Sequence, residues 1–156
     1  MTQSHWTCKN CKTTDTQLKY NSSSMQFCKD CQKYKNIQIN SNVARKRVKK
    51  PDLLISEHDF LNWIRSSERK CFYCDISENQ LSQLEIKSQI GLKVQSLGID
   101  RIDSSGDYTT TNIVLCCFMC NKVKSDCFTI SEMKFLGESI KQIWKKRLEV
   151  LNATNN

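Results

Sequence analysis

A segment of mixed polar and apolar residues near position 60 has the spacing of an amphipathic helix. Ser56, followed three residues later by Asp59, resembles a helix N-cap with an acidic first turn. Phe60, Leu61 and Ile64 then fall on one helical face, with Trp63 beside them. The pattern predicts a helix that begins next to Ser56 and packs through this apolar face.

The clearest helical pattern lies near the C-terminus. Thr129 and Glu132 are spaced as a capping box, in which each side chain bonds the backbone N–H of the other residue. The apolar residues that follow recur at helical spacing: Met133, Leu136, Ile140, Ile143, Trp144, Leu148 and Leu151. The opposite face is basic, with Lys141, Lys145, Lys146 and Arg147. We expect the apolar stripe to face the core of its module.

Between these two helices the pattern changes to that of short strands. Residues 97–103 have the composition of a strand, 104–107 that of a turn, and 112–116 that of a second strand rich in β-branched and apolar residues. A short helix is predicted to begin within 117–125. Residues 75–96 are rich in Gln and Ser with weak apolar periodicity, which predicts a variable excursion.

The composition does not support one large core. The 156 residues are 38% hydrophobic and 8% aromatic, and small modules of this kind usually need covalent or metal staples. The first ten residues are polar, and no run approaches the ~20 apolar residues that a membrane span needs. We therefore expect an intracellular protein without a membrane partner, in which thiols stay reduced.

Ten cysteines supply the staples. Eight of them form four Cys-x-x-Cys pairs, a spacing typical of zinc sites: Cys8/Cys11, Cys28/Cys31, Cys71/Cys74 and Cys117/Cys120. Four pairs can combine into two sites in three ways. Loop-closure entropy favours the local combination, because only 16 residues separate Cys11 from Cys28. We predict one structural zinc on Cys8, Cys11, Cys28 and Cys31, and a second on Cys71, Cys74, Cys117 and Cys120.

Other uses of these cysteines fit less well. A thioredoxin-type redox site needs one pair beside a βαβ pattern, and a RING finger needs a nearer third pair and a His at ligand spacing. Cys116 competes with Cys117 for the last ligand position, but only Cys117 leaves the two-residue gap to Cys120. We expect Cys116 and Cys127 to be ordinary, partly buried thiols.

The excess of positive over negative charge is confined to the first third of the chain. Residues 1–50 contain 11 Lys/Arg and 2 Asp/Glu, whereas residues 51–156 contain 13 and 14, within a total net charge of +8. The charge peaks in one run: Arg45, Lys46, Arg47, Lys49 and Lys50. Such a run is compatible with a solvated linker, but beside zinc modules it favours the phosphates of nucleic acid as partner.

These features predict three parts. Residues 1–35 form a zinc-binding module with four cysteine ligands, in which a hairpin between Cys11 and Cys28 closes over the metal. Residues 36–52 form a basic linker, in part helical, that ends at the single proline, Pro51. Residues 53–151 form a second module that ends in the C-terminal amphipathic helix.

Five short motifs follow one another in the second module. They are Cys71-Phe-Tyr-Cys74, Gly98-Ile-Asp-Arg-Ile-Asp103, Gly106-Asp-Tyr108, Asn112 and Cys117-Phe-Met-Cys120-Asn121-Lys-Val-Lys124. Their order and spacing over residues 55–135 resemble the zinc-stapled subgroup of the HNH (ββα-metal) endonucleases. The first module resembles the four-cysteine zinc ribbon in front of endonuclease VII-like nucleases. The resemblance implies an α+β protein of small zinc-stabilised modules with a treble-clef-like ββα-metal fold.

The resemblance also assigns roles to residues. It implies that Asp100 and Asn121 bind one catalytic Mg²⁺ or Mn²⁺, and that Asn112 shapes the hairpin loop by hydrogen bonding its backbone. Carboxylate and amide oxygens are hard ligands suited to these ions, which stabilise charge on the phosphate and on the leaving 3′ oxygen.

One position departs from the family pattern. Arg101 stands where the family has its first His, the general base, and a guanidinium cannot accept a proton. The two histidines, His5 and His58, lie outside the motif. Arg101 could clamp the scissile phosphate, oriented by an ion pair with Asp103 on the same strand face, while Asp103 or a metal-bound water handles the proton. It could equally mark a domain that only binds.

The sequence therefore predicts a metal-dependent DNA endonuclease, with duplex DNA as partner and a homodimer as a compatible assembly. Lys122 and Lys124 are expected to contact DNA together with the basic run. The alternatives are a catalytically decayed HNH-fold protein that binds DNA, and a zinc protein that binds RNA.

Overall fold

The computed structural model describes residues 6–19, 26–42, 51–84, 86, 94 and 96–154, and its contacts divide the chain into two compact units, Met1–Ser67 and Glu68–Asn156. The basic run from Arg45 to Lys50 lies outside the described residues. None of the described helices is both long enough and apolar enough to cross a membrane. Helices and a small antiparallel sheet together confirm the α+β class.

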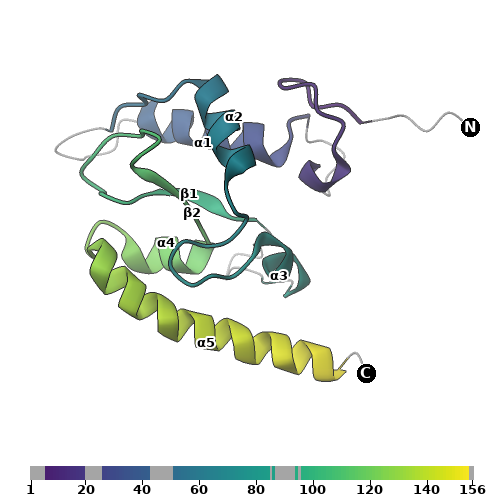
Figure 1. The fold of residues 1–156 in the computed structure, drawn as a ribbon, viewed down its shortest axis with the longest axis vertical. Coiled ribbons are helices and arrows are strands. Elements are labelled where there is room, and N and C mark those ends of the chain that lie inside the picture. Colours follow the sequence, from purple (N-terminus) through teal and green to yellow (C-terminus); the bar gives the residue numbers. More distant parts are fainter. Residues whose placement is uncertain are drawn as a thin grey trace, which may run out of the picture. The chain divides into compact units, whose positions relative to one another are not determined.

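Unit 1 is built around two helices. After the 3₁₀ turn η1 (Thr16–Leu18) come α1 (Lys29–Asn42) and α2 (Glu57–Ser66), and the two α-helices pack against each other (Figure 1). Helix α1 thus runs through the first part of the expected linker. Because α2 packs on α1, it groups with the N-terminal unit, whereas the sequence placed it in the second module.

The contact between α1 and α2 is aromatic. The ring centroids of Tyr34 and Phe60 lie 5.4 Å apart, and the Tyr34 hydroxyl donates to the carbonyl of Ile55 at 3.2 Å. The predicted start of α2 is confirmed, since the Ser56 side chain accepts from the backbone N–H of Asp59. This cap fixes where the chain turns into α2, so the apolar face of the helix meets Tyr34.

The described part of unit 2 holds the hairpin and three helices. In chain order they are α3 (Glu78–Gln83), β1 (Gly98–Arg101), β2 (Ile113–Cys116), α4 (Phe118–Lys124) and α5 (Ile130–Thr154). The strands pair antiparallel, with Asp100 opposite Val114. Helix α4 contacts both β1 and α5, so it lies between the hairpin and the long C-terminal helix (Figure 1).

The loop that joins the strands is closed by one side chain. Asn112 accepts from the backbone N–H of Asp103 at 2.8 Å, and its amide group donates to the carbonyls of Asp103 and Asp107 at 3.1 and 2.9 Å. A Cβ at Gly106 would come within 2.9 Å of the Asn112 amide nitrogen, which explains a glycine at this point. The turn therefore keeps its shape through Asn112.

Helix α3 was not expected. Ser77 and Gln80 form a capping box, in which each side chain accepts a hydrogen bond from the other's backbone N–H. Leu81 is the buried residue of this helix. Polar residues dominate the helix, so it has too little apolar periodicity to be recognised, although the capping box itself was readable.

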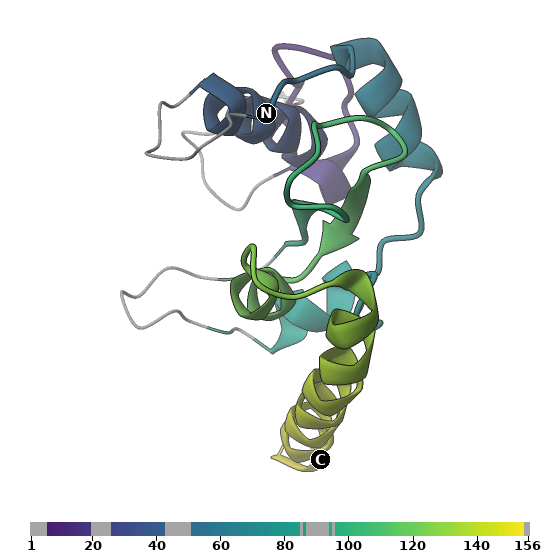
Figure 2. The ribbon, with the colours of Figure 1, turned by 90° about the vertical axis from the view of Figure 1, so that its left-hand side faces the viewer.

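Helix α5 begins as predicted, with the capping box of Thr129 and Glu132. Met133, Ile140 and Trp144 are buried, as expected of a core-facing stripe. The stripe is covered only in part, because Ile143 is 47% exposed. Figure 2 shows the C-terminal half of the helix running on past the other described elements of this unit.

Candidate functional site

The two knuckles formed by Cys8/Cys11 and by Cys71/Cys74 have the same backbone structure. In the first, the N–H of Cys8 donates to Thr13 O at 2.9 Å, and the N–H of Lys12 donates to Cys8 O at 3.1 Å. Lys12 has a positive φ of 60°. A tight turn of this kind brings the side chains of Cys8 and Cys11 to the same side.

The second knuckle repeats each of these contacts. Here the N–H of Cys71 donates to Ile76 O and the N–H of Asp75 donates to Cys71 O, both at 2.9 Å. Asp75 has a φ of 59°, at the position equivalent to Lys12. Two segments unrelated by sequence outside their cysteines therefore adopt one metal-binding turn.

The remaining pairs each stand at the start of a helix. The Cys28 sulfur accepts from the N–H of Cys31 at 3.4 Å, just ahead of α1. The Cys117 sulfur accepts from the N–H of Cys120 at 3.4 Å and caps α4. Each helix thus presents two sulfurs beside its N-terminus, as the second half of a four-cysteine site.

Both predicted clusters are confirmed. The sulfurs of Cys8, Cys11, Cys28 and Cys31 lie within 4.8 Å of one another, and so do those of Cys71, Cys74, Cys117 and Cys120. The sulfurs of Cys11 and Cys28 are 3.7 Å apart, as are those of Cys74 and Cys117. Tetrahedral zinc, with Zn–S of about 2.3 Å, requires sulfurs about 3.8 Å apart. Both clusters therefore fit zinc.

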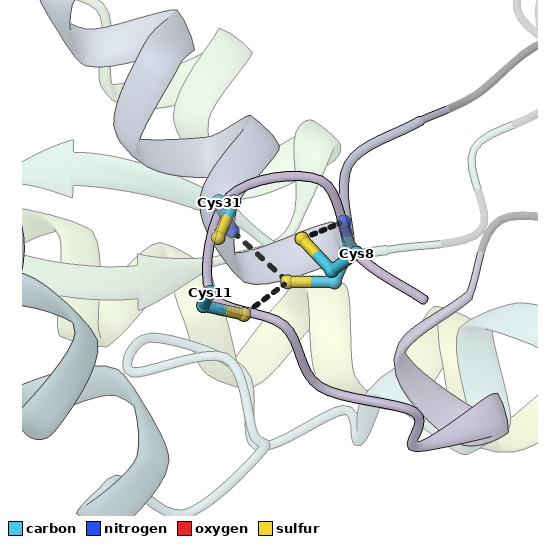
Figure 3. Close-up of side chains that lie close together, drawn as sticks. Cys8, Cys11 and Cys31 are labelled. Carbon is cyan, nitrogen blue, oxygen red and sulfur yellow. Dashed lines mark hydrogen bonds between the residues drawn. The ribbon is translucent and has the colours of Figure 1, made fainter. Parts of the chain in front are cut away.

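Figure 3 shows the sulfur atoms of Cys8, Cys11 and Cys31 gathered within the first cluster. Burial raises the pKa of Cys31 to about 11, so this thiol would stay protonated at neutral pH without a cation. A bound dication offsets that cost. The four sulfurs could therefore hold a metal ion.

The two cysteines outside the clusters differ from each other. Cys116 is buried at the end of β2, where its thiol donates to the carbonyl of Cys117 at 3.3 Å. Cys127 is exposed, whereas we expected a partly buried thiol. The tight turn after α4 leaves it outside the packed core.

Among the residues that the structure describes in unit 2, Asp100 is the buried carboxylate. It lies on β1 and is only 8% exposed. The hydroxyl of Tyr73 donates to its Oδ2 at 2.8 Å, and the ammonium of Lys124 lies 3.4 Å from the same oxygen. Sequence reasoning assigned no role to Tyr73. Its place inside a Cys-x-x-Cys knuckle was the available signal, because that knuckle has to reach the cluster next to the strands.

The backbone explains how Tyr73 reaches Asp100. The N–H of Phe72 donates to Leu115 O on β2 at 2.9 Å, which fixes the second knuckle against the hairpin. Burial, together with the negative charge of Asp100, raises the pKa of the Tyr73 phenol. The phenol is therefore protonated at neutral pH in the metal-free protein and acts as a donor to the carboxylate.

The side chain of Arg101 contacts Gly106 and Tyr108, and the expected ion pair with Asp103 is not its main interaction. The strand β1 ends at Arg101, so Asp103 is not on a common strand face with it. The guanidinium donates to the carbonyl of Gly106 and lies over the Tyr108 ring, 5.2 Å from its centroid. The Asp103 carboxylate accepts from the hydroxyl and the N–H of Ser105 at 2.7 and 2.8 Å.

Those bonds from Ser105 are the main reason why the pKa of Asp103 is lowered, and the charge of Arg101 adds a smaller effect. A carboxylate held in its ionised form by two donors is a weak proton acceptor. The sequence-based expectation that Asp103 and Arg101 act together is therefore not supported by their contacts.

The two lysines expected to contact DNA have different surroundings. Lys122 is exposed on α4. Lys124 is fully buried, and its ammonium donates to Arg101 O at 2.8 Å and to Ser104 Oγ at 2.7 Å. The assignment of Lys124 to the DNA-facing surface was wrong, because its whole side chain lies inside unit 2.

Asn121 lies on α4, one turn after its N-cap, and is half-buried. Since α4 contacts β1, the elements that carry Asn121 and Asp100 are neighbours. His58 is on α2 in the other unit, with its side chain 82% exposed, as expected of a solvated histidine.

No protein-family model matches the chain, and no curated protein matches it. Among solved structures, the chain is similar to the rare-cutting HNH restriction endonuclease PacI, in a structure that describes how this enzyme perturbs DNA. The two share 34% sequence identity with a TM-score of 0.78. The similarity covers 90% of this chain and 96% of the other, so it includes both units.

Proposed function

The chain belongs to the HNH endonuclease family, and from this premise we propose that it is a metal-dependent endonuclease that hydrolyses phosphodiester bonds in duplex DNA. The observation that carries the proposal is the buried carboxylate of Asp100, on a strand that contacts the helix bearing Asn121. The neighbouring strand and helix thus carry a carboxylate and a side-chain amide, the two residue types that the family uses to hold its divalent cation.

Asp100 and Asn121 would hold the divalent cation. Their carboxylate and amide oxygens are the ligand types that Mg²⁺ and Mn²⁺ prefer. A cation bound there supplies charge stabilisation for the phosphate and the leaving oxygen, and lowers the pKa of a neighbouring phenol. Asn112 supports the site from the loop, because it fixes the turn that follows Arg101.

The family's general base is missing at Arg101, and we assign to Tyr73 the role of positioning Asp100, because its protonated phenol donates to that carboxylate. Arg101 cannot accept a proton, and Asp103 is held ionised by Ser105. The Tyr73 hydroxyl is an ionisable group in direct contact with Asp100, 2.8 Å away. Arg101 would then stabilise the hairpin loop through Gly106 and Tyr108, in place of clamping the phosphate.

DNA binding is assigned mainly to the first third of the chain, where residues 1–50 carry an excess of nine positive charges. Lys122, which follows Asn121 in α4, adds one exposed positive charge. One active site cuts one strand at a time, so a homodimer would cut both strands in a single binding event.

The test is cleavage of supercoiled plasmid with Mg²⁺ or Mn²⁺. Wild type should convert the plasmid to nicked or linear DNA, whereas Asp100→Asn and Asn121→Ala should lose at least about a hundredfold in rate with both zinc ions retained. Glu149→Gln, an exposed carboxylate on α5, is the matched control and should cut normally. Linear product at the first turnover would indicate paired copies.

A second function is supported by Arg101 in place of the family's His. If the wild type binds duplex DNA tightly yet never cuts it with either cation, the chain is a catalytically decayed HNH protein that binds DNA. Tighter binding to RNA than to duplex DNA in the same assay would favour an RNA-binding zinc protein.

A further inference from the structure

A lysine whose side chain is fully buried is unusual, because removing an ammonium group from water is costly unless other groups compensate. Lys124 is such a residue, at the last turn of α4. Its neighbour Lys122 is exposed, so the same helix also has a solvent-facing side on which a lysine ammonium stays hydrated.

Each contact of the Lys124 ammonium lies in the segment that carries the site. Arg101 O, at 2.8 Å, is at the end of β1, and Ser104 Oγ, at 2.7 Å, belongs to the hairpin loop. Asp100 Oδ2, at 3.4 Å, is the charged partner. One side chain therefore joins the end of α4 to the end of β1 and to the loop.

The loop is tied to the same helix end by a second bond. The hydroxyl of Ser104 donates to the carbonyl of Ser125 at 3.2 Å, and Ser125 ends α4 with a positive φ of 49°. The helix thus stops where Lys124 can point inward. These contacts fix the position of the strand that carries Asp100 relative to the helix that carries Asn121.

Tyr73 completes the arrangement from another side. Its hydroxyl donates to Oδ2 of Asp100, the same oxygen that faces the Lys124 ammonium. Both contacts are made to Oδ2 of the carboxylate, and neither involves Oδ1. Oδ1 is therefore the oxygen that we assign to the divalent cation.

We propose that Lys124 is an internal cation that positions Asp100 and competes with the catalytic divalent cation for its charge. The proposal rests on the proposed function, since it assumes that Asp100 is a ligand of that cation. Lys124 neutralises Asp100 in the metal-free protein, so the site stays folded without a metal. The same positive charge then weakens metal binding, because two cations share one carboxylate.

This proposal predicts opposite effects on metal affinity and on turnover. Lys124→Met keeps the length and apolar stem of the side chain but removes the charge. We expect it to bind Mn²⁺ at least about tenfold more tightly, since like-charge repulsion is relieved. We expect kcat to fall at least about tenfold, because the variant lacks the group that fixes the position of Asp100 relative to α4. A merely structural role would weaken both.

The measurement is Mn²⁺ binding by calorimetry or paramagnetic resonance, on zinc-loaded protein without DNA, next to the cleavage rate at saturating Mn²⁺. Lys146→Met, on the exposed side of α5, removes one lysine charge away from Asp100 and Asn121; it is the control and should leave the Mn²⁺ affinity unchanged. Unchanged or weaker Mn²⁺ binding by folded Lys124→Met overturns the proposal.

If Lys124→Met does not fold, wild type and Ser104→Ala provide the test. The ¹⁵N resonance of the Lys124 ammonium, assigned through its side-chain carbons, should shift on addition of Mg²⁺, and Asp100→Asn should abolish that shift. In Ser104→Ala, which keeps the charge but removes one acceptor, the resonance should still respond. A carboxylate signal of Asp100 that responds to Mg²⁺ while Lys124 does not would refute competition.

Failure of this inference differs from failure of the proposed function. If wild type neither cuts DNA nor binds Mn²⁺ through Asp100, the nuclease assignment itself is wrong. If wild type cuts and loses Mn²⁺ binding with Asp100→Asn, yet Lys124→Met binds Mn²⁺ as wild type does, only the role of Lys124 is wrong.

Discussion

Gly137 of α5 lies directly against the backbone carbonyl of Tyr73. A Cβ at position 137 would stand 2.1 Å from Tyr73 O and 2.7 Å from its carbonyl carbon, so no larger residue fits without movement of the backbone. An ion pair between Lys141 and Asp75, at 2.6 Å, joins the same two segments one turn further along. The long helix therefore helps to place the phenol that contacts Asp100.

We expect Gly137→Ala to displace the second knuckle from α5. The added methyl group meets backbone atoms that cannot rotate away, so the variant should lose about 1–3 kcal/mol of stability and a large part of its cleavage rate. Urea unfolding and the plasmid assay measure the two effects. Ser139→Ala, an exposed position on the same helix, should change neither. A fully active Gly137→Ala enzyme would contradict this packing.

Each chain should contain two zinc ions, one in each four-cysteine cluster. Structural zinc contributes on the order of 10 kcal/mol to small modules, so chelation should unfold both units. Elemental analysis should give two zinc per chain in wild type and one in Cys8→Ser or Cys71→Ser. Cys127→Ser, which changes an exposed thiol outside the clusters, should keep both. One zinc or none in folded wild type would disprove the ligand assignment.

Tyr73→Phe should abolish most of the cleavage while zinc content and DNA affinity stay as in wild type, because it removes only the hydroxyl that contacts Asp100. The pH–rate profile of wild type should rise with pH without the inflection near ~6.5 that a histidine base produces. A His-like inflection that His58→Ala removes would place the general base on α2 and contradict this prediction.

The same phenol should affect stability at high pH. Its pKa is raised above the ordinary value of ~10 by burial, so the folded state holds the proton more tightly than the unfolded state does. This contribution is fully present below pH ~10 and is lost as the pH rises further, through the folded pKa. The unfolding free energy of wild type should therefore fall more steeply in alkali than that of Tyr73→Phe. Equal slopes would exclude a buried, protonated Tyr73.

Neutralising the basic run should reduce DNA affinity and its dependence on salt. Replacement of Arg45, Lys46, Arg47, Lys49 and Lys50 by Gln should lower the log–log salt slope on duplex DNA by about 0.9 for each phosphate that the variant no longer neutralises. Neutralising Lys145, Lys146 and Arg147 on the exposed side of α5 is the comparison and should have a smaller effect. An unchanged slope in the first variant would show that the protein binds DNA through other residues.

Local spacing alone determined much of this protein. The Cys-x-x-Cys pairs identified both metal clusters, because a two-residue gap limits how two sulfurs can face one ion. The caps at Ser56 and Thr129 located two helix starts, since a capping side chain bonds a backbone N–H only three residues away. The hairpin followed from segments only a few residues long, whereas the loop role of Asn112 came from the resemblance to the HNH family.

Only the tertiary structure decided which side chains meet at Asp100. Lys124 and Lys122 are the same residue type two positions apart, and the packing of α4 on β1 alone makes one of them buried and the other exposed. Tyr73 precedes Asp100 by 27 residues, and Gly137, which contacts Tyr73, lies on the C-terminal helix α5. Such contacts depend on how separate elements pack together, and spacing along the chain carries no information about them.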